Sequence, residues 1–185
     1  MDGVAGDKYP HAIARQVAEH DRNDPHDDLV RQAAQLQARD LCEYCLHPTY
    51  GQFHIDHIIP AALWHDYTAG RLSGVAEPPS RRRGPDHLDN FAWACPFCNV
   101  AKSQHVAHRV GRQTIRLFDP RHDRWPDHFT FMNNYLFVVG VTAIGVATQQ
   151  ALRFNEDGIG GPLGTRHNTI VAGLYPPARI FRRDP

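Results

Sequence analysis

The chain has 185 residues, of which 42% are hydrophobic and 22% are charged, with 20 basic and 20 acidic side chains. This composition is typical of a globular domain of ordinary size and excludes a disordered or fibrous chain. The longest nearly apolar stretch, residues 135–147, is shorter than the roughly 20 residues of a membrane-spanning helix. Because no apolar leader follows Met1, we expect a cytoplasmic protein without membrane contact, whose cysteines are reduced.

The elements predicted for the first 110 residues follow from hydrophobic spacing and turn residues. They are a polar arm over 1–26, a helix over 28–40, a strand over 53–59, a long loop over 61–87, a strand over 91–94 and a helix over 96–110. Asp27 or Asp28 caps the first helix, and Leu29, Ala33 and Leu36 form its apolar stripe. One helical turn is expected near Leu63, and Pro96 suits a first helical turn.

The remaining chain is predicted to add a small extension to this core. Its expected elements are a strand over 114–118, a hairpin of strands 129–131 and 136–141, a helix from Thr142 to 154, and a last strand over 169–175. Asn133 and Asn134 suit the hairpin turn, and glycines break the chain between 158 and 164. We therefore divide the chain into an arm (1–26), a core (27–113) and a C-terminal extension packed on the core (114–185).

Charge is unevenly distributed although it sums to zero. Residues 1–30 hold seven acidic and three basic side chains, whereas residues 71–116 hold eight basic and three acidic ones. A basic middle is compatible with a phosphate-binding face, but charge alone favours a solvated surface loop.

The four cysteines form two C-x-x-C pairs, Cys42/Cys45 and Cys95/Cys98. Two such turns that face each other present four thiolates in the tetrahedral arrangement that structural Zn²⁺ prefers. A disulfide framework needs an oxidising compartment, and a redox C-x-x-C would leave the second pair without a role. Structural zinc is therefore the favoured interpretation, and four thiolates leave no open coordination position for catalysis.

Between the two pairs lie Phe53-His54-Ile55-Asp56-His57-Ile58-Ile59-Pro60 and, later, Asn90; Asn99 and Lys102 follow the last cysteine. This pattern resembles the HNH endonuclease family, specifically its four-cysteine branch. The resemblance covers about residues 42–103, and the segment from Leu117 to Phe129 is similar to the tail of stand-alone bacterial members. The loop between Pro60 and Asn90 is longer than in many members.

The resemblance implies an α+β fold: a ββα-metal finger stapled by a four-cysteine zinc site, with an N-terminal helix and a small C-terminal strand and helix extension. It implies that His57 is the general base, that Asp56 and Asn99 bind a catalytic Mg²⁺ or Mn²⁺, and that Asn90 holds the base in position. Such a site hydrolyses DNA phosphodiester bonds with water that His57 activates. Arg81, Arg82, Arg83 and Lys102 are candidate phosphate contacts, and His54 is either an accessory residue or an ordinary strand histidine.

Two other functions remain open at this point. The chain could be a zinc-stabilised DNA-binding module without catalysis, or a structural zinc protein within a larger complex. Enzymes with a single such motif either nick one strand or pair up to cut both, which makes a homodimer or a larger complex compatible with the nuclease interpretation.

Overall fold

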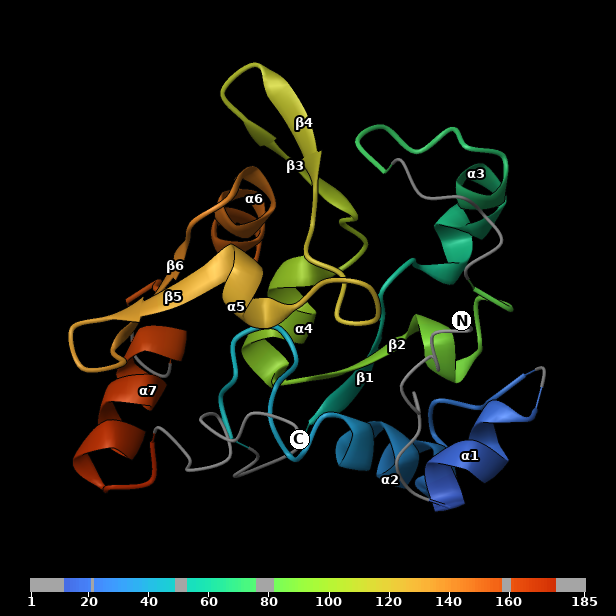
Figure 1. Cartoon of the computed structure of the whole chain (residues 1–185), viewed down its shortest axis with the longest axis horizontal. Coiled ribbons are helices and arrows are strands. Elements are labelled where there is room, and N and C mark those ends of the chain that lie inside the picture. Colours follow the sequence, from blue (N-terminus) through green and yellow to red (C-terminus); the bar gives the residue numbers. More distant parts are fainter. Residues whose placement is uncertain (1–11, 21, 49–52, 76–81, 158–160, 176–185) are drawn as a thin grey trace, which may run out of the picture.

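The computed structural model describes residues 12–20, 22–48, 53–75, 82–157 and 161–175, which fold as an α+β protein. In these residues the strands form three separate two-stranded antiparallel sheets, β1–β2, β3–β4 and β5–β6 (Figure 1). No helix of these ranges is long and apolar enough to cross a bilayer.

The N-terminal part forms two helices that pack on each other, α1 (Ala12–Ala18) and α2 (Asp28–Gln37). Asp27 caps α2 by accepting hydrogen bonds from the backbone N–H groups of Leu29 and Val30 (2.8 and 3.3 Å), as predicted. The buried face of α2 consists of Val30, Ala33 and Ala34, whereas Leu29 is 51% exposed. The apolar stripe predicted for α2 was therefore wrong by about one residue at its start. Part of the expected polar arm is helix α1, which packs against the core.

The next elements surround a four-residue hairpin. Strand β1 (His54–His57) pairs with β2 (Phe91–Ala94), so that Asp56 lies opposite Ala92 and His57 opposite Phe91. Between them lie η1 (Ala61–Leu63), α3 (Trp64–Thr68) and η3 (Leu88–Asn90). All four residues of β2 are buried, which agrees with their continuous apolar run.

Helix α4 (Pro96–Lys102) follows β2 directly, with Cys95 as its N-cap and Pro96 at its first position. The helix was predicted to reach residue 110, but it ends at Lys102, and Ser103 adopts a left-handed φ of 48°. The chain then forms the hairpin of β3 (Ala107–Val110) and β4 (Gln113–Arg116). Pairing with β4 and packing on α6 favour the strand over a continued helix. The boundary predicted at residue 113 thus lies inside a hairpin.

The C-terminal part consists of α5 (Trp125–His128), β5 (Phe129–Met132), β6 (Phe137–Gly140), α6 (Ala143–Ala151) and α7 (Pro162–Val171). Thr142 caps α6 by accepting a hydrogen bond from the N–H of Gly145 (3.1 Å), as expected. Gly145 is also a point of close approach, because a Cβ there would lie 2.0 Å from the His128 carbonyl oxygen. Residues 169–175 were predicted as a strand, but most of them belong to α7 and its end.

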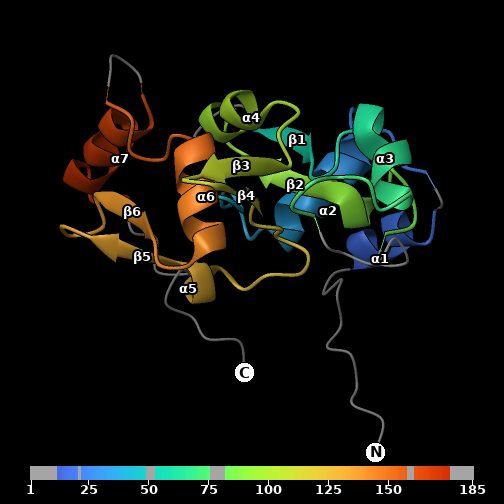
Figure 2. The ribbon, with the colours of Figure 1, turned by 90° about the horizontal axis from the view of Figure 1, so that it is seen from above.

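One hydrophobic core runs through all three predicted segments. It includes Val17 from α1, Phe91 from β2, Leu117 after β4, and Phe129 and Phe154 from the C-terminal part. Figure 2 shows α6 beside the β3–β4 hairpin, on the side of the molecule away from α1 and α2.

Candidate metal centre and adjoining polar cavity

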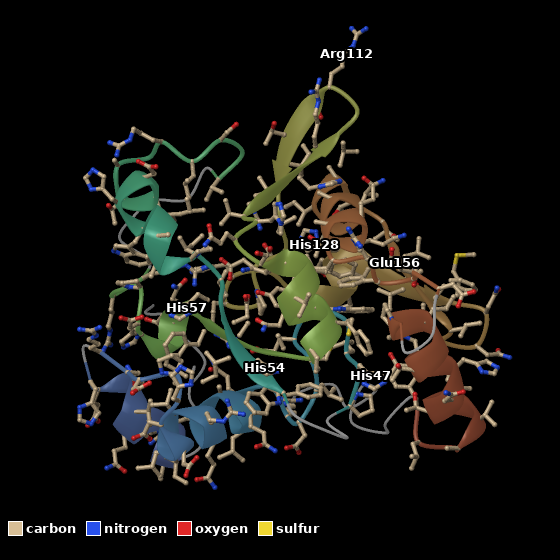
Figure 3. All side chains as sticks on the ribbon, turned by 180° about the vertical axis from the view of Figure 1, so that it is seen from behind. His47, His54, His57, Arg112, His128 and Glu156 are labelled. Atoms are coloured by element: carbon tan, nitrogen blue, oxygen red, sulfur yellow. The ribbon has the colours of Figure 1, made fainter. Side chains whose placement is uncertain are left out.

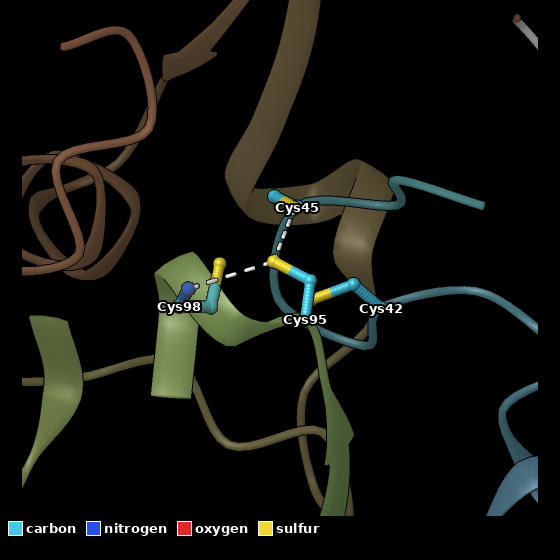
Figure 4. A group of neighbouring side chains, drawn as sticks. All are labelled: Cys42, Cys45, Cys95 and Cys98. Atoms are coloured by element: carbon cyan, nitrogen blue, oxygen red, sulfur yellow. Dashed lines mark hydrogen bonds between the residues drawn. The ribbon is translucent and has the colours of Figure 1, made fainter. Parts of the chain in front are cut away.

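The two C-x-x-C pairs come together as predicted. Their four sulfur atoms lie within 4.8 Å of one another, all four side chains are buried, and none is in a disulfide. Cys45 Sγ lies 3.8 Å from Cys95 Sγ (Figure 4). A zinc ion with Zn–S bonds of about 2.3 Å separates its sulfurs by about 3.8 Å, so the spacing fits a metal such as zinc and is far longer than a disulfide bond.

Backbone hydrogen bonds shape the first pair and attach it to the hairpin. The N–H of Leu46 donates to the Cys42 carbonyl and the N–H of Cys42 donates to the His47 carbonyl (both 2.8 Å). Glu43 bridges to β2, since its N–H donates to the Trp93 carbonyl (2.9 Å) and its carboxylate accepts the Trp93 N–H (2.8 Å). The second pair needs no such loop, because Cys95 ends β2 and caps α4.

The surroundings of the thiols favour a bound cation. Burial raises the pKa of Cys42 and Cys98, whereas hydrogen bonds with the other thiols lower the pKa of Cys45. Four buried sulfurs so close together cannot all ionise without a cation between them, because their negative charges would repel one another. The donor set is soft, four-coordinate and closed, which suits structural zinc.

Arg166 of α7 is an unexpected neighbour of this cluster. The side chain is fully buried, and its guanidinium donates to the carbonyls of Leu136 (2.8 Å) and Phe154 (3.2 Å) and to Asn155 Oδ1 (3.3 Å), all uncharged. Its positive charge adds to the lowering of the Cys45 pKa that the neighbouring thiols cause. Four thiolates around a Zn²⁺ ion would keep about two net negative charges, which this guanidinium would partly balance.

We therefore expect Arg166→Met to weaken zinc binding by about 10-fold, the lower end of the range for groups that support a metal site, because Arg166 acts on Cys45 through its charge and donates its hydrogen bonds to Leu136, Phe154 and Asn155. Titration of the purified protein with a competing zinc chelator measures this. Arg166→Lys keeps the charge and should lose less affinity. Equal zinc affinity in Arg166→Met and the wild-type protein would exclude an electrostatic role for this arginine.

Beside the cysteine cluster lies a polar cavity of about 300 Å³, lined by the end of β1, by η1 and by the end of α4. Asp56, His57 and Asn99 all line it, together with Ser103 and Gln104. Strand β1 ends at His57 and the chain bends at residues 58 and 59. Neighbouring strand residues point to opposite faces, yet Asp56 and His57, the last two residues of β1, both contribute atoms to the lining of this cavity.

Asp56 is buried, and its carboxylate contacts two other side chains. Its Oδ2 accepts a hydrogen bond from the Tyr44 hydroxyl (2.6 Å) and lies 2.9 Å from Lys102 Nζ, which also donates to Oδ1 (3.1 Å). Lys102 further donates to the His57 carbonyl (2.7 Å). Burial raises the pKa of Asp56, and the charge of Lys102 opposes that rise. The aspartate is thus held in one orientation by a residue of the first C-x-x-C pair and by the last residue of α4.

His57 is held by a different set of residues. Its Nε2 lies 3.1 Å from Asp86 Oδ1, and its ring packs edge-on against Phe91. About a quarter of each side chain of this pair remains exposed to solvent. Arg22 contacts the other oxygen of Asp86 (3.2 Å). His57 is therefore oriented by a carboxylate while its side chain stays partly exposed to solvent.

Asn90 positions His57 and Asp86 indirectly, through hydrogen bonds to the backbone beside them. It is fully buried, its Oδ1 accepts the Ile59 N–H (2.9 Å), and its Nδ2 donates to the carbonyls of Ile59 and Pro85 (2.8 Å each). These bonds fix the chain two residues after His57 and one residue before Asp86. Asn90 therefore pins both members of the His57–Asp86 pair without touching either side chain.

The other predicted site residues lie elsewhere. His54 begins β1, is exposed, and is separated from His57 by the length of the strand (Figure 3). Arg82 is buried and binds Asp119 and the Asp89 carbonyl, while Arg83 is exposed and donates to the Ala18 carbonyl (2.7 Å). Lys102 is committed to Asp56, so neither it nor Arg82 presents an exposed cation. Arg81 lies outside the described residues.

Sequence reasoning missed three residues that the structure brings to these sites: Tyr44, Asp86 and Arg166. Tyr44 stands inside the first C-x-x-C, and Asp86 precedes Asn90 by four residues, so proximity in sequence offered a weak signal for both. Arg166 is separated from the cysteines by more than 60 residues and offered none. No family model, curated protein or solved structure matches this chain.

Proposed function

We propose that the chain is a metal-dependent DNA endonuclease of the HNH type, in which β1, β2 and α4 form the ββα-metal finger. The observation that carries the proposal is the single cavity lined by Asp56, His57 and Asn99 next to four clustered cysteines. An aspartate, a histidine and an asparagine that line one cavity are residue types that phosphodiester hydrolysis can use, as metal ligands and as a general base.

Asp56 and Asn99 are the residues that would hold a catalytic Mg²⁺ or Mn²⁺. Both offer hard oxygen ligands, and a carboxylate has about four acceptor positions, of which Tyr44 and Lys102 occupy three. The donor chemistry therefore fits such an ion. When bound, the ion supplies positive charge to the phosphate and leaving oxygens. Lys102 and Tyr44 oppose the rise in the Asp56 pKa that burial causes, and they orient the carboxylate.

His57 is the proposed general base. An imidazole that donates its Nε2–H to Asp86 carries its lone pair on Nδ1, which is then the atom that accepts the proton of the attacking water. Asp86 stabilises the resulting imidazolium, and Asn90 holds the backbone on which His57 and Asp86 are placed. The four-cysteine zinc site holds β2 and α4 in place and takes no part in the chemistry.

The test is cleavage of supercoiled plasmid DNA in the presence of Mg²⁺ or Mn²⁺. We expect His57→Ala to reduce the rate at least 100-fold, the usual minimum contribution of a general base. His54→Ala is the matched control, because it removes an exposed histidine from the same strand and should cut at the wild-type rate. Wild-type cleavage by folded, zinc-loaded His57→Ala would refute the assignment of the base.

A DNA-binding module without catalysis is the second candidate, and the Lys102–Asp56 pair favours it. An ammonium group that already neutralises Asp56 weakens the attraction of this carboxylate for a second cation. DNA binding without nicking across Mg²⁺, Mn²⁺, Ca²⁺, Co²⁺ and Ni²⁺ would support this candidate over the nuclease.

A further inference from the structure

The β3–β4 hairpin is a two-stranded ribbon that projects from the body of the protein (Figure 1). Arg109 pairs with Thr114 across the ribbon, and Val110 pairs with Gln113. Val110 and Ile115 share one face and pack against the hydrophobic core, and α6 packs against both strands. The opposite face, with Arg109 and Thr114, is exposed. The ribbon is thus held rigidly on one face and open on the other.

This ribbon lies in the longest acid-free part of the chain. No aspartate or glutamate occurs between residues 90 and 118, which include Lys102, Arg109, Arg112 and Arg116. Lys102 binds Asp56, and Arg116 binds Asp123 (2.5 and 2.7 Å). Arg109 and Arg112 are different, because both are exposed and, among the described residues, no carboxylate pairs with either. Figure 3 shows Arg112 at the tip, pointing away from the body.

The ribbon starts beside the polar cavity. Ser103 and Gln104, which line the cavity, precede the first residue of β3 by only a few positions. Figure 1 shows the hairpin and α3 projecting to the same side of the molecule, above β1 and α4. The loop after α3 reaches the ribbon, since a Cβ on Gly74 would lie 3.0 Å from the Thr114 carbonyl oxygen. A long polymer that occupies the cavity would therefore pass along the ribbon.

We propose that the β3–β4 ribbon is a duplex-DNA contact arm that lies in the major groove, with Arg109 and Arg112 on the flanking phosphates. This inference rests on the proposed function and names the surface that holds its substrate. The major groove is about 12 Å wide and admits a two-stranded ribbon, and arginine suits bidentate binding of phosphate. The exposed Thr114, which shares the open face with Arg109, carries a hydroxyl group toward the groove.

The test compares wild-type protein with Arg109→Ala/Arg112→Ala for binding of a fluorescent 30-base-pair duplex and of the matching single strand, in Ca²⁺ at several salt concentrations. Two lost phosphate contacts should lower the slope of log affinity against log salt by about 1.8, which weakens duplex binding by roughly 10- to 100-fold at 0.1 M salt. The loss on the single strand should be smaller. Arg15→Ala/Arg124→Ala removes two exposed arginines outside the ribbon and should leave the slope unchanged.

The outcomes separate this inference from the proposed function. A slope and a duplex affinity equal to wild type in the ribbon variant, with zinc content and circular dichroism also equal, would overturn the contact arm. An equal loss on duplex and single strand would overturn its placement in a groove. If the wild-type protein cuts plasmid while the ribbon variant binds normally, only the contact arm fails. If the wild-type protein neither binds nor cuts DNA, both fail.

Discussion

Cys98→Ser is expected to abolish stoichiometric zinc binding and to leave most of the protein unfolded at 37 °C. Structural zinc sites contribute about 10–16 kcal/mol of apparent binding free energy at neutral pH, whereas a whole domain is stable by about 5–15 kcal/mol. A serine hydroxyl does not replace a thiolate ligand, and the other three sulfurs would remain buried around an incomplete site. Zinc content of the purified protein and thermal unfolding followed by circular dichroism measure the two effects.

Val100→Ser is the matched control for this variant. Val100 lies on the same helix, α4, and is 76% exposed, so it tests whether serine in this helix is harmful in itself. We expect it to bind one zinc ion and to melt near the wild-type temperature. A Cys98→Ser protein that melts with Val100→Ser would show that the fold does not depend on the cluster.

The dependence on the cluster follows from the shortness of the elements that it joins. Strands β1 and β2 have four residues each and α4 has seven, and helices and hairpins this short are marginal alone. The cysteines join the loop after α2 to the end of β2 and the start of α4. Zinc at this point would therefore fix the relative positions of Asp56 and Asn99, which come from β1 and α4.

The sequence could predict the elements whose signals are local. Phe91–Ala94 is a strand as expected, because an apolar run this short is the length of a strand and not of a helix. Thr142 caps a helix because its hydroxyl accepts a nearby N–H. The end of α4 was not predicted, because residues 103–110 carry no strong stop signal and become a hairpin through pairing with 113–116. Thr169, Ile170 and Val171 favour a strand by propensity, yet the helix that begins at Pro162 includes them.

In the candidate site, too, local signals were predictable and contacts with distant residues were not. Residue types and spacing could predict that the four cysteines cluster, and they singled out Asp56, His57 and Asn99, which share a cavity. They could not predict the use of each charged side chain, because that depends on partners far away in sequence. Lys102 meets Asp56 across 46 residues and Arg82 meets Asp119 across 37. In both, a cation expected to face phosphate neutralises a buried carboxylate.

Lys102→Met is expected to destabilise the protein by about 3–5 kcal/mol at neutral pH, because it leaves the buried Asp56 carboxylate without its cation. The effect should depend on pH. Burial raises the pKa of Asp56 and Lys102 opposes the rise, so the folded variant takes up a proton more readily than the unfolded chain. A raised folded-state pKa favours folding at low pH, and this contribution is lost as the pH rises through the folded-state pKa. The difference from wild type should therefore be largest at neutral pH and should shrink toward acid.

Urea unfolding of both proteins from pH 5.5 to 8 measures this difference, and comparison at each pH removes the contribution of the cysteine cluster, which both share. The double variant Asp56→Asn/Lys102→Met removes both charges and should regain most of the lost stability, since replacing a whole buried pair costs far less than breaking it. Because this variant has no carboxylate at residue 56, the stability that it regains over the single variant should be largest at neutral pH. A single variant with the same loss at every pH, or a double variant no more stable than the single one, would mean that Lys102 acts through packing alone. Its ammonium would then not be what keeps Asp56 charged at the cavity.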